Sequence, residues 1–160
     1  MPRVTVRTAT ADDRELVAVA TLENFNWNGP RFTMAEIDRN EQARHYYADW
    51  PGADDFGLVA QDGDGAAVGV VWLRCFPETD PGYGFVADDI PELSIWVSAE
   101  HRGRGIGSTL MREAIELARS RRIRAISLSV EDGNPAKRLY ERYGFGPALN
   151  GAPGCLLLNL

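Results

Sequence analysis

The spacing of hydrophobic positions changes repeatedly between residues 92 and 145, alternating between the period of a strand and that of a helix. Strands are predicted at Glu92–Ser98 and Arg124–Val130, and helices at Gly105–Arg121 and Asn134–Tyr143. The first helix has a broad apolar face, formed by Ile106, Leu110, Met111, Ala114, Ile115 and Ala118. This order predicts two parallel strands joined by a right-handed crossover.

The first fifty residues carry a weaker pattern. Val4–Arg7 alternates as a short strand, and Thr10–Asp13 has the form of a capping box at the start of a helix that ends near Glu23. The segment from Thr33 to about Asp49 predicts a second, weaker helix. The amino-terminal part of the chain is therefore expected to contribute one strand and two helices.

Two apolar segments in the middle of the chain predict a hairpin. Phe56–Gln61 and Ala66–Phe76 are separated by Asp62–Gly65, whose residues tolerate a positive φ, so the two strands should be antiparallel. The following Pro77–Pro91 segment is a long loop, which we expect to border a substrate. With a last apolar strand at Cys155–Leu160, the pattern predicts a mixed α/β fold.

Length and composition indicate an ordinary globular protein. The 160 residues fit one domain, residues 1–160, with 44% hydrophobic and 25% charged side chains. A net charge of -6 argues against nucleic-acid binding, which needs a basic face, and suits either a cationic acceptor or simple solubility. The amino terminus has no apolar leader, and the longest apolar stretch, Ala66–Leu73, is too short to span a bilayer. We expect a cytoplasmic protein with no membrane partner.

Cysteine and histidine usage gives little sign of metal or redox chemistry. Cys75 and Cys155 lie in apolar strand-like segments without C-x-x-C spacing, so buried, inert thiols are expected rather than a disulfide. With His45 and His101 as the only histidines, we expect no metal site.

A glycine-rich turn joins the predicted strand at residues 92–98 to the helix that follows. Gly103, Gly105 and Gly107 allow backbone N–H groups to approach an anion closely, and the first N–H groups of a helix lack internal partners and carry partial positive charge. Arg102 and Arg104 add two full charges. The alternative is a tight strand-to-helix connection, but three glycines beside two arginines favour an anion site.

The spacing of this turn narrows the choice of anion. No lysine precedes Ser108, so the turn is not a Walker loop. Its G-x-G-x-G spacing differs from the G-x-G-x-x-G dinucleotide fingerprint, and the unit follows a hairpin instead of opening a doubly wound sheet. A nucleotide-dependent oxidoreductase is therefore a minor alternative.

A second motif, Asn134-Pro-Ala-Lys-Arg-Leu-Tyr-Glu-Arg-Tyr-Gly-Phe145, reads as a short helix with both ends marked. Asn134 is a good cap, proline follows at the first helical position, and Gly144 ends the helix. Tyr140 shares one face with other apolar residues, so an ordinary core aromatic is the alternative to a functional role.

Together the two segments closely resemble the GNAT superfamily of acetyl-CoA-dependent acetyltransferases. Arg102-Gly-Arg-Gly-Ile-Gly107 is similar to the family's Gln/Arg-x-x-Gly-x-Gly/Ala pyrophosphate motif, and Asn134–Phe145 to its N-x-A-x-x-L-Y-x-x-x-G-F segment. The resemblance covers residues 92–145, about a third of the chain. It implies the GNAT fold, a central mixed twisted β-sheet of roughly six to seven strands flanked by about four helices.

The resemblance also implies acetyl-CoA as cosubstrate and assigns residues to it. The backbone of Ile95, Trp96 and Val97 would pair with pantetheine, and Asn134 would contact the cofactor arm. The pyrophosphate would be held by Arg102, Gly103, Arg104, Gly105, Ile106, Gly107 and Ser108. Tyr140 would protonate the leaving thiolate, which suits a phenol whose ordinary pKa is about 10.

An acceptor amine needs a route for its proton. Only roughly one in 2,500 molecules of an alkyl amine with a pKa of about 10.4 is free base at pH 7. Glu92, at the start of the strand before the turn, is the candidate base, because partial burial would raise its pKa. A surface salt bridge and a contact to the acceptor's ammonium are the alternatives for this residue.

Phe25, Trp27 and Tyr83 lie in segments that border the acceptor in the family, and we expect them to contact it by cation-π interaction, with ordinary packing as the alternative for each. The predicted function is transfer of an acetyl group from acetyl-CoA to a primary amine of a small molecule or peptide, by direct attack in a ternary complex. A non-catalytic acyl-CoA sensor on the same fold is the main alternative, and a homodimer is a possible assembly.

Overall fold

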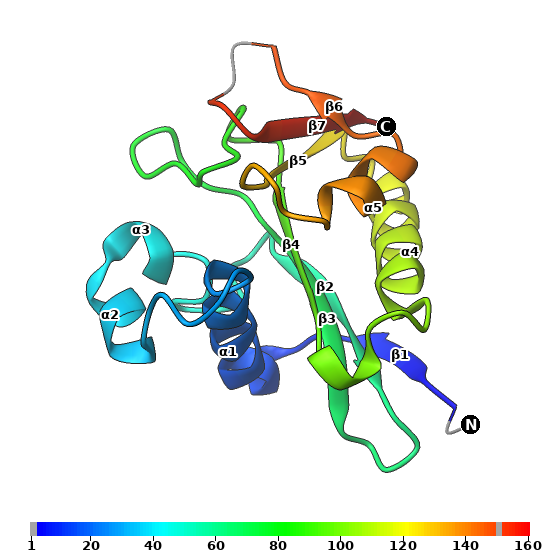
Figure 1. The fold of residues 1–160 in the computed structure, drawn as a ribbon. Coiled ribbons are helices and arrows are strands. Elements are labelled where there is room, and N and C mark those ends of the chain that lie inside the picture. The colour runs from blue at the N-terminus through cyan, green and yellow to red at the C-terminus, as the bar shows by residue number, and fades with distance from the viewer. Residues whose placement is uncertain (1–2, 150–151) are drawn as a thin grey trace.

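The computed structural model describes residues 3–149 and 152–160, which build one seven-stranded sheet in the order β1-β2-β3-β4-β5-β7-β6 (Figure 1). Neighbouring strands are antiparallel except for the parallel pair β4 and β5. The strands are β1 (Thr5–Thr8), β2 (Phe56–Gln61), β3 (Ala67–Arg74), β4 (Glu92–Val97), β5 (Ala125–Ser129), β6 (Gly146–Pro147) and β7 (Cys155–Asn159). The helices are α1 (Arg14–Phe25), α2 (Met34–Arg39), α3 (Glu41–Arg44), α4 (Ile106–Ser120) and α5 (Lys137–Arg142). The predicted mixed α/β fold and the parallel pair are confirmed.

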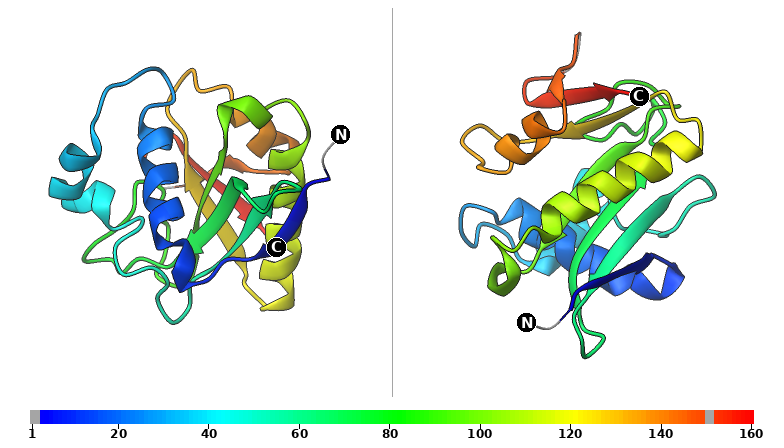
Figure 2. Two further views of the ribbon diagram at one scale, coloured as in Figure 1. Left: turned by 90° about the horizontal axis from the view of Figure 1, so that it is seen from below. Right: turned by 90° about the vertical axis from the view of Figure 1, so that its right-hand side faces the viewer.

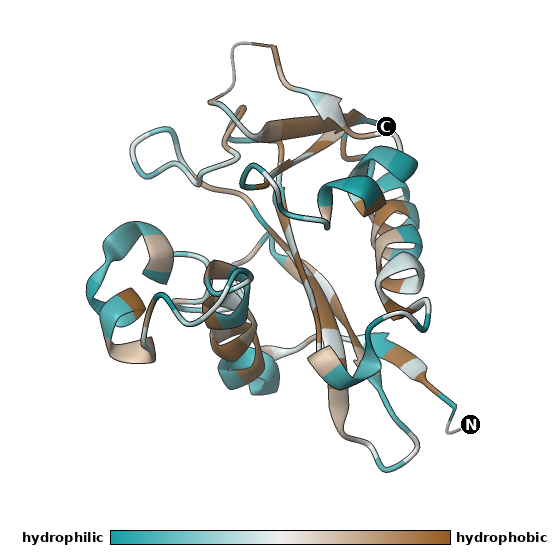
Figure 3. Cartoon of the chain, in the orientation of Figure 1, coloured by the Kyte–Doolittle hydropathy of each residue, from teal (hydrophilic) through white to brown (hydrophobic). Residues whose placement is uncertain are grey.

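Helices cover both faces of the sheet, α1 to α3 on one side and α4 and α5 on the other (Figures 1 and 2). The core under α1 is built around the fully buried Val17, Trp50 and Trp72, and the core under α4 around Leu110 and Met111. In Figure 3 the hydrophobic colour runs along the strands between these two layers. The sheet thus separates two apolar cores.

The α4 helix has the apolar face that its sequence predicts. Ile106, Leu110, Met111, Ala114, Ile115 and Ala118 are all buried. These side chains pack on β2, β3 and β4, so the helix is held rigidly with its amino end beside the carboxyl end of β4. The position of the glycine turn follows from this packing.

The predicted helix from Thr33 to about Asp49 is wrong. Two short helices, α2 and α3, occupy the first part of this segment and turns the rest. The break falls at Asn40, whose φ and ψ of -97° and 106° are extended. Its side-chain oxygen accepts from the backbone N–H groups of Gln42 (3.0 Å) and Ala43 (3.2 Å). Asparagine competes well as an N-cap, so it ends one helix and starts another.

The helix of the second motif starts later than its sequence predicts. Asn134 caps a single turn, accepting from the Ala136 N–H at 3.0 Å, and regular helix begins at Lys137. The stop at Gly144 is as predicted, since this residue has a φ of 98°. The turn and the short helix together fix the position of Tyr140, the buried residue of α5.

The two parallel strands separate almost as soon as they meet. Glu92 and Ser127 are their one registered pair, and the Ser127 N–H also donates to the Pro91 carbonyl at 3.0 Å. Beyond this point β4 remains paired with β3, and β5 with β7. The sheet therefore opens into a wedge whose narrow end is at Glu92.

Within residues 3–149 and 152–160, no helix is long and apolar enough to cross a membrane, and no three His, Cys, Asp or Glu side chains are grouped to hold a metal ion. Both cysteines are free thiols; Cys155 is buried as predicted, while Cys75 is half-buried. Burial raises the pKa of Cys155, and that of Cys75 to about 11, so both stay protonated at neutral pH.

Candidate active site

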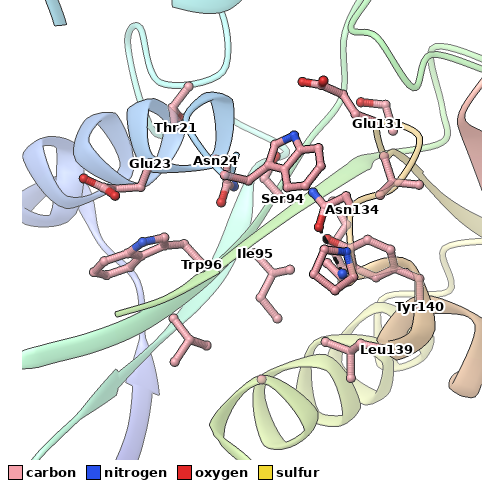
Figure 4. Close-up of a pocket in the computed structure, with 18 of the residues that line it drawn as sticks. Thr21, Glu23, Asn24, Ser94, Ile95, Trp96, Glu131, Asn134, Leu139 and Tyr140 are labelled. Carbon is pink, nitrogen blue, oxygen red and sulfur yellow. Dashed lines mark hydrogen bonds between the residues drawn. The ribbon is translucent and has the colours of Figure 1, made fainter. Parts of the chain in front are cut away.

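A cavity of about 590 Å³ occupies the wedge between β4 and β5. Its walls come from the end of α1, from β4, from the turn before α4 and from the start of α5. Figure 4 shows Ile95 and Trp96 leaving β4 on opposite sides, with Leu139 and Tyr140 of α5 across from Ile95. All of the predicted site residues line this cavity except Arg104 and Ser108. Residues far apart in the sequence are thus brought to one place.

The glycine turn is built to approach a ligand. Gly103 and Gly105 have φ values of 77° and 79°, and a Cβ added to either would meet no atom within 4 Å. Gly105 is the N-cap of α4 and supplies no side-chain cap, so the first N–H groups of a fifteen-residue helix lack a side-chain partner. The exposed Arg102 is oriented by a hydrogen bond from its Nε to the Val97 carbonyl (3.3 Å). An open, positively polarised surface of this kind fits a diphosphate.

Arg104 and Ser108 lie away from this surface. Arg104 borders a separate, smaller cavity beside β1. The Ser108 carbonyl accepts a hydrogen bond from the Tyr143 hydroxyl at 2.9 Å, which ties α4 to the end of α5. Their predicted part in holding a pyrophosphate therefore remains a prediction, with less geometric support than the three glycines have.

The edge of β4 that faces the wedge offers backbone groups to a ligand. Because β5 diverges after Glu92, the stretch from Ile95 to Val97 has a neighbouring strand on the β3 side but not on the cavity side. The Val97 carbonyl accepts from Arg102, and the other cavity-facing groups have no partner among the described strands. Unpaired backbone groups at a strand edge bind extended ligands that carry amides. The side chains of Ile95 and Val97 lie on the cavity side of the core under α4.

Tyr140 reaches the cavity from α5 and is only 8% exposed. Its ring packs edge-to-face on Phe145 with centroids 6.2 Å apart, so it also serves the core as the alternative interpretation expected. The hydroxyl makes no hydrogen bond within the described part of the chain. Burial raises the pKa of Tyr140 to about 12, which keeps this hydroxyl protonated and available as a donor.

Glu92 is 4% exposed at the narrow end of the wedge. Its Oε1 accepts from the Gly84 N–H at 2.9 Å, and its Oε2 accepts a very short hydrogen bond from the Tyr46 hydroxyl. Among the described residues it forms no ion pair, so the surface salt bridge weighed from the sequence does not describe it. Burial raises the pKa of Glu92 to about 7, against the opposing effect of the two hydrogen bonds. A carboxyl with such a pKa can take up and release protons near neutral pH.

Tyr46 is the site residue that sequence reasoning did not single out. It lies in the turns after α3, in a segment predicted as plain helix, and the tertiary fold carries it to Glu92. Its hydroxyl also accepts from the Tyr83 N–H at 2.7 Å. One sequence signal was present, namely the number of aromatic residues in the amino-terminal segments, but this does not identify one tyrosine among several.

The three predicted acceptor residues, Phe25, Trp27 and Tyr83, all line the cavity. Phe25 and Tyr83 meet edge-to-face with centroids 6.1 Å apart, and Tyr83 stacks parallel to Tyr46 at 6.2 Å. Tyr83 is 40% exposed, so its ring is available to a ligand. Trp27 lines the cavity as well, with its ring 4.0 Å from a Cβ built on Gly133. The three aromatic residues therefore line the cavity, and their contact with an acceptor remains a prediction.

Glu131, which lines the cavity, forms an exposed charged pair. Arg31, in the segment between α1 and α2, forms a two-pronged pair with Glu131, which follows β5, with the shorter N···O distance at 2.7 Å. The guanidinium of Arg31 also donates to the Phe25 carbonyl. Glu131 thus links the two sides of the wedge.

Comparison with known proteins agrees with this arrangement. Residues 21–145 match the model of the family described as the acetyltransferase (GNAT) family. A Bacillus subtilis protein provisionally named a ribosomal protein bS18-alanine N-acetyltransferase is 39% identical over 67 residues, which cover 41% of this chain and 44% of that protein. A mycothiol acetyltransferase of Beutenbergia cavernae is 35% identical over 91 residues, covering 56% and 28%. The chain thus matches less than half the length of these two relatives.

Solved structures share the fold over nearly the whole chain. An acetyltransferase of the GNAT family from Staphylococcus aureus has a TM-score of 0.70 at 16% identity, with 99% of each chain covered. PaiA N-acetyltransferase from Thermoplasma acidophilum, solved in complex with coenzyme A, has a TM-score of 0.69 at 17% identity, again with 99% of each chain covered. At this level of identity the similarity establishes the fold.

Proposed function

The chain belongs to the GNAT family of acetyltransferases, and we propose on that basis that it transfers an acetyl group from acetyl-CoA to a primary amine by direct attack in a ternary complex. The observation that carries the proposal is one continuous cavity, which runs from the turn glycines past Tyr140 to Glu92. It joins an anion-binding surface to a proton donor and a candidate base. Residues 1–160 would form one domain of this type.

The cosubstrate supplies the acetyl group as a thioester, and the chain supplies the surfaces that hold it. The N–H groups at the start of α4 would bind the diphosphate, with Arg102 adjacent, and the open edge of β4 would pair with the amides of the pantetheine arm. Asn134, at the cavity wall, would contact the same arm. The PaiA structure, on the same fold, was solved in complex with coenzyme A, which supports coenzyme A as the ligand.

Proton transfer would use two titratable groups that line the cavity, Glu92 and Tyr140. Glu92 takes the proton that the acceptor nitrogen loses as the new carbon–nitrogen bond forms, and Tyr140 gives its hydroxyl proton to the sulfur as the carbon–sulfur bond breaks. A pKa of about 7 for Glu92 and of about 12 for Tyr140 gives each group the protonation state that its step needs at neutral pH. Phe25, Trp27 and Tyr83 would surround the acceptor, and cation-π contact would favour a charged amine.

The class of acceptor is proposed as a primary amine on a small molecule or a peptide terminus. The two curated relatives are named for acceptors of different size, a ribosomal protein and mycothiol. The negative net charge of -6 is compatible with either kind of cationic acceptor.

Two measurements on purified protein test the proposal. A thermal-shift comparison should give a rise in melting temperature with acetyl-CoA and none with NAD, because a ligand far above its dissociation constant stabilises the fold by a few kcal/mol. Thiol release with a panel of primary amines should then identify turnover. Binding of acetyl-CoA without turnover by any amine would favour the sensor, and a shift with NAD alone would favour the oxidoreductase.

A matched pair of variants locates the binding surface. Gly105→Asp should abolish the shift with acetyl-CoA, since a carboxylate would stand where the diphosphate binds. Gly65→Asp, in the hairpin between β2 and β3, is the control: both glycines have a φ close to 80°, and neither has an atom within 4 Å of an added Cβ. Equal shifts for the two variants would mean that the diphosphate binds elsewhere.

A further inference from the structure

Two segments outside the sheet enclose the carboxylate of Glu92. The Gly84 N–H, from the long loop before β4, donates to Oε1 at 2.9 Å. The Tyr46 hydroxyl, from the turns after α3, donates to Oε2. Each oxygen therefore has one fixed donor, and this fixes the plane of the carboxylate and leaves its remaining lone pairs for a proton from another source.

The direction of the Tyr46 hydrogen bond is settled by its surroundings. Because the Tyr46 oxygen accepts from the Tyr83 N–H at 2.7 Å, its own proton is directed to Glu92. The backbone of Tyr46 is held as well, since its carbonyl accepts from the Trp72 indole at 3.0 Å. The ring packs edge-to-face on Phe76 with centroids 5.2 Å apart. The hydroxyl is thus an oriented donor on a rigid support.

The long loop wraps the carboxylate too closely for ordinary side chains. A Cβ on Gly82 would collide with the Glu92 carboxylate, and a Cβ on Gly84 would lie 2.6 Å from the backbone of Leu128. The Gly82-Tyr83-Gly84 sequence therefore lets the loop donate two backbone N–H groups at once, one to Glu92 and one to Tyr46. A loop that only covered the core would not need its backbone to lie so close to the Glu92 carboxylate.

The other titratable and charged groups around Glu92 and Tyr46 are engaged elsewhere or are neutral. They are Arg74 of β3, His45 after α3, Tyr83 of the loop and Cys155 of β7. Arg74 is bound by Asp55 at 2.9 Å, and His45 by Asp80 at 3.1 Å. Burial lowers the pKa of His45 and raises those of Tyr83 and Cys155, which keeps these three groups neutral near pH 7. The Tyr46 hydroxyl is the nearest side-chain donor to the carboxylate.

We propose that Tyr46 is a positioning residue for acetyl transfer, whose hydroxyl orients the Glu92 carboxylate and favours its charged form so that it can accept the amine proton at neutral pH. The inference rests on the proposed function, in which Glu92 is the base. Tyr46 acts through Glu92 and needs no contact with either substrate. The 77–91 loop takes part by fixing the hydroxyl through the Tyr83 N–H.

The test is the pH profile of kcat/KM for Tyr46→Phe, which removes the hydroxyl and keeps the ring. Loss of a hydrogen bond to a charged carboxylate should raise the pKa of Glu92, so the acid limb of the profile should move up by about one pH unit or more. Relative to wild type at the same pH and with the same amine, the variant should be about tenfold slower at pH 6.5 and nearly equal at pH 9. The KM for acetyl-CoA should not change.

Tyr47→Phe is the matched control. Tyr47 is the next residue, is also buried, and donates its hydroxyl to Asp38, away from Glu92. Its loss should leave the acid limb in place. A purely structural role for Tyr46 would lower the rate by the same factor at every pH, and that result would overturn the proposal.

Glu92→Gln separates this inference from the proposed function. If the acid limb disappears in Glu92→Gln but stays unmoved in Tyr46→Phe, the inference fails while the base remains; if no amine is acetylated by the wild type, the function itself fails. Carbon-13 NMR of wild-type protein supplies a test that needs no variant: the Tyr46 carbon bearing the hydroxyl should shift with the midpoint of the Glu92 carboxyl. Independent midpoints would overturn the inference.

Discussion

Replacing Glu92 by glutamine should change how the stability of the protein depends on pH. The pKa of this buried carboxyl is raised from an ordinary 4.5 to about 7 in the fold, so the folded state binds a proton more tightly than the unfolded chain does. The stabilisation is complete below pH 4.5 and is lost as the pH rises through 7. Glutamine carries no such proton, so this part of the pH dependence should vanish in the variant.

The size of the effect follows from the two pKa values. At about 1.4 kcal/mol for each pH unit, the interval between 4.5 and about 7 corresponds to roughly 3 kcal/mol, most of which falls between pH 5 and pH 8. Because Glu92 is only 4% exposed, solvent screening takes little from this figure. Relative to wild type, Glu92→Gln should therefore gain about 2 to 3 kcal/mol of unfolding free energy on going from pH 5 to pH 8.

Urea denaturation of both proteins at pH 5 and pH 8 measures how the pH change alters the unfolding free energy of each. The contributions of the other titrating groups cancel when the two proteins are compared. Glu116→Gln, at an exposed position of α4, controls for the loss of one negative charge. A stability difference between Glu92→Gln and wild type that is the same at pH 5 and pH 8 would refute the argument that burial raises the pKa of Glu92.

Three further results are expected. Tyr140→Phe should lower kcat by about 100-fold in a thiol-release assay and leave the melting-temperature shift with acetyl-CoA intact, because the ring still packs on Phe145; an unchanged kcat would remove Tyr140 from the proposed mechanism. Leu110→Ala should cost about 3 kcal/mol in urea denaturation, since this side chain is fully buried under α4; a loss under 1 kcal/mol would mean that this core is loosely packed. Arg31→Met should change the KM for the amine less than fivefold and only at low salt, because the Arg31 and Glu131 side chains are 39% and 51% exposed; an effect that persists in 1 M salt would contradict a screened surface pair.

The parts of the fold that local sequence determines were predicted well. The α4 helix and the glycine turn depend on a periodic apolar face and on residues at fixed offsets, and both lie where the sequence places them. The prediction of one helix after Thr33 failed because Asn40 both ends one helix and starts another, and the spacing of apolar residues does not reveal such a cap. In short segments with weak hydrophobic patterns, tertiary contacts determine the secondary structure.

The surroundings of Glu92 show the limit of the same reasoning. Glu92 was predicted as the base from its place at the start of a strand. The groups that donate hydrogen bonds to it belong to Tyr46 and Gly84, on two other segments. No periodicity connects these segments, since the contacts arise only when the long loop and the turns after α3 fold over the sheet. Burial, on which the pKa of Glu92 depends, is likewise a property of the assembled fold.

The wedge between β4 and β5 also has a mechanical consequence. With a single registered rung at Glu92 and Ser127, the sheet consists of a four-stranded half and a three-stranded half whose strands pair at one point. Helix α4 and side-chain contacts such as the Arg31–Glu131 pair also connect the two halves. Small rotations about that rung would widen or narrow the cavity without breaking any other strand pair. Amide hydrogens of β4 that face the cavity rather than β3 should exchange with solvent faster than those shared by β2 and β3, and a ligand laid along β4 would slow them by replacing the missing strand. A ligand bound in the gap would therefore hold the two halves of the sheet in one orientation.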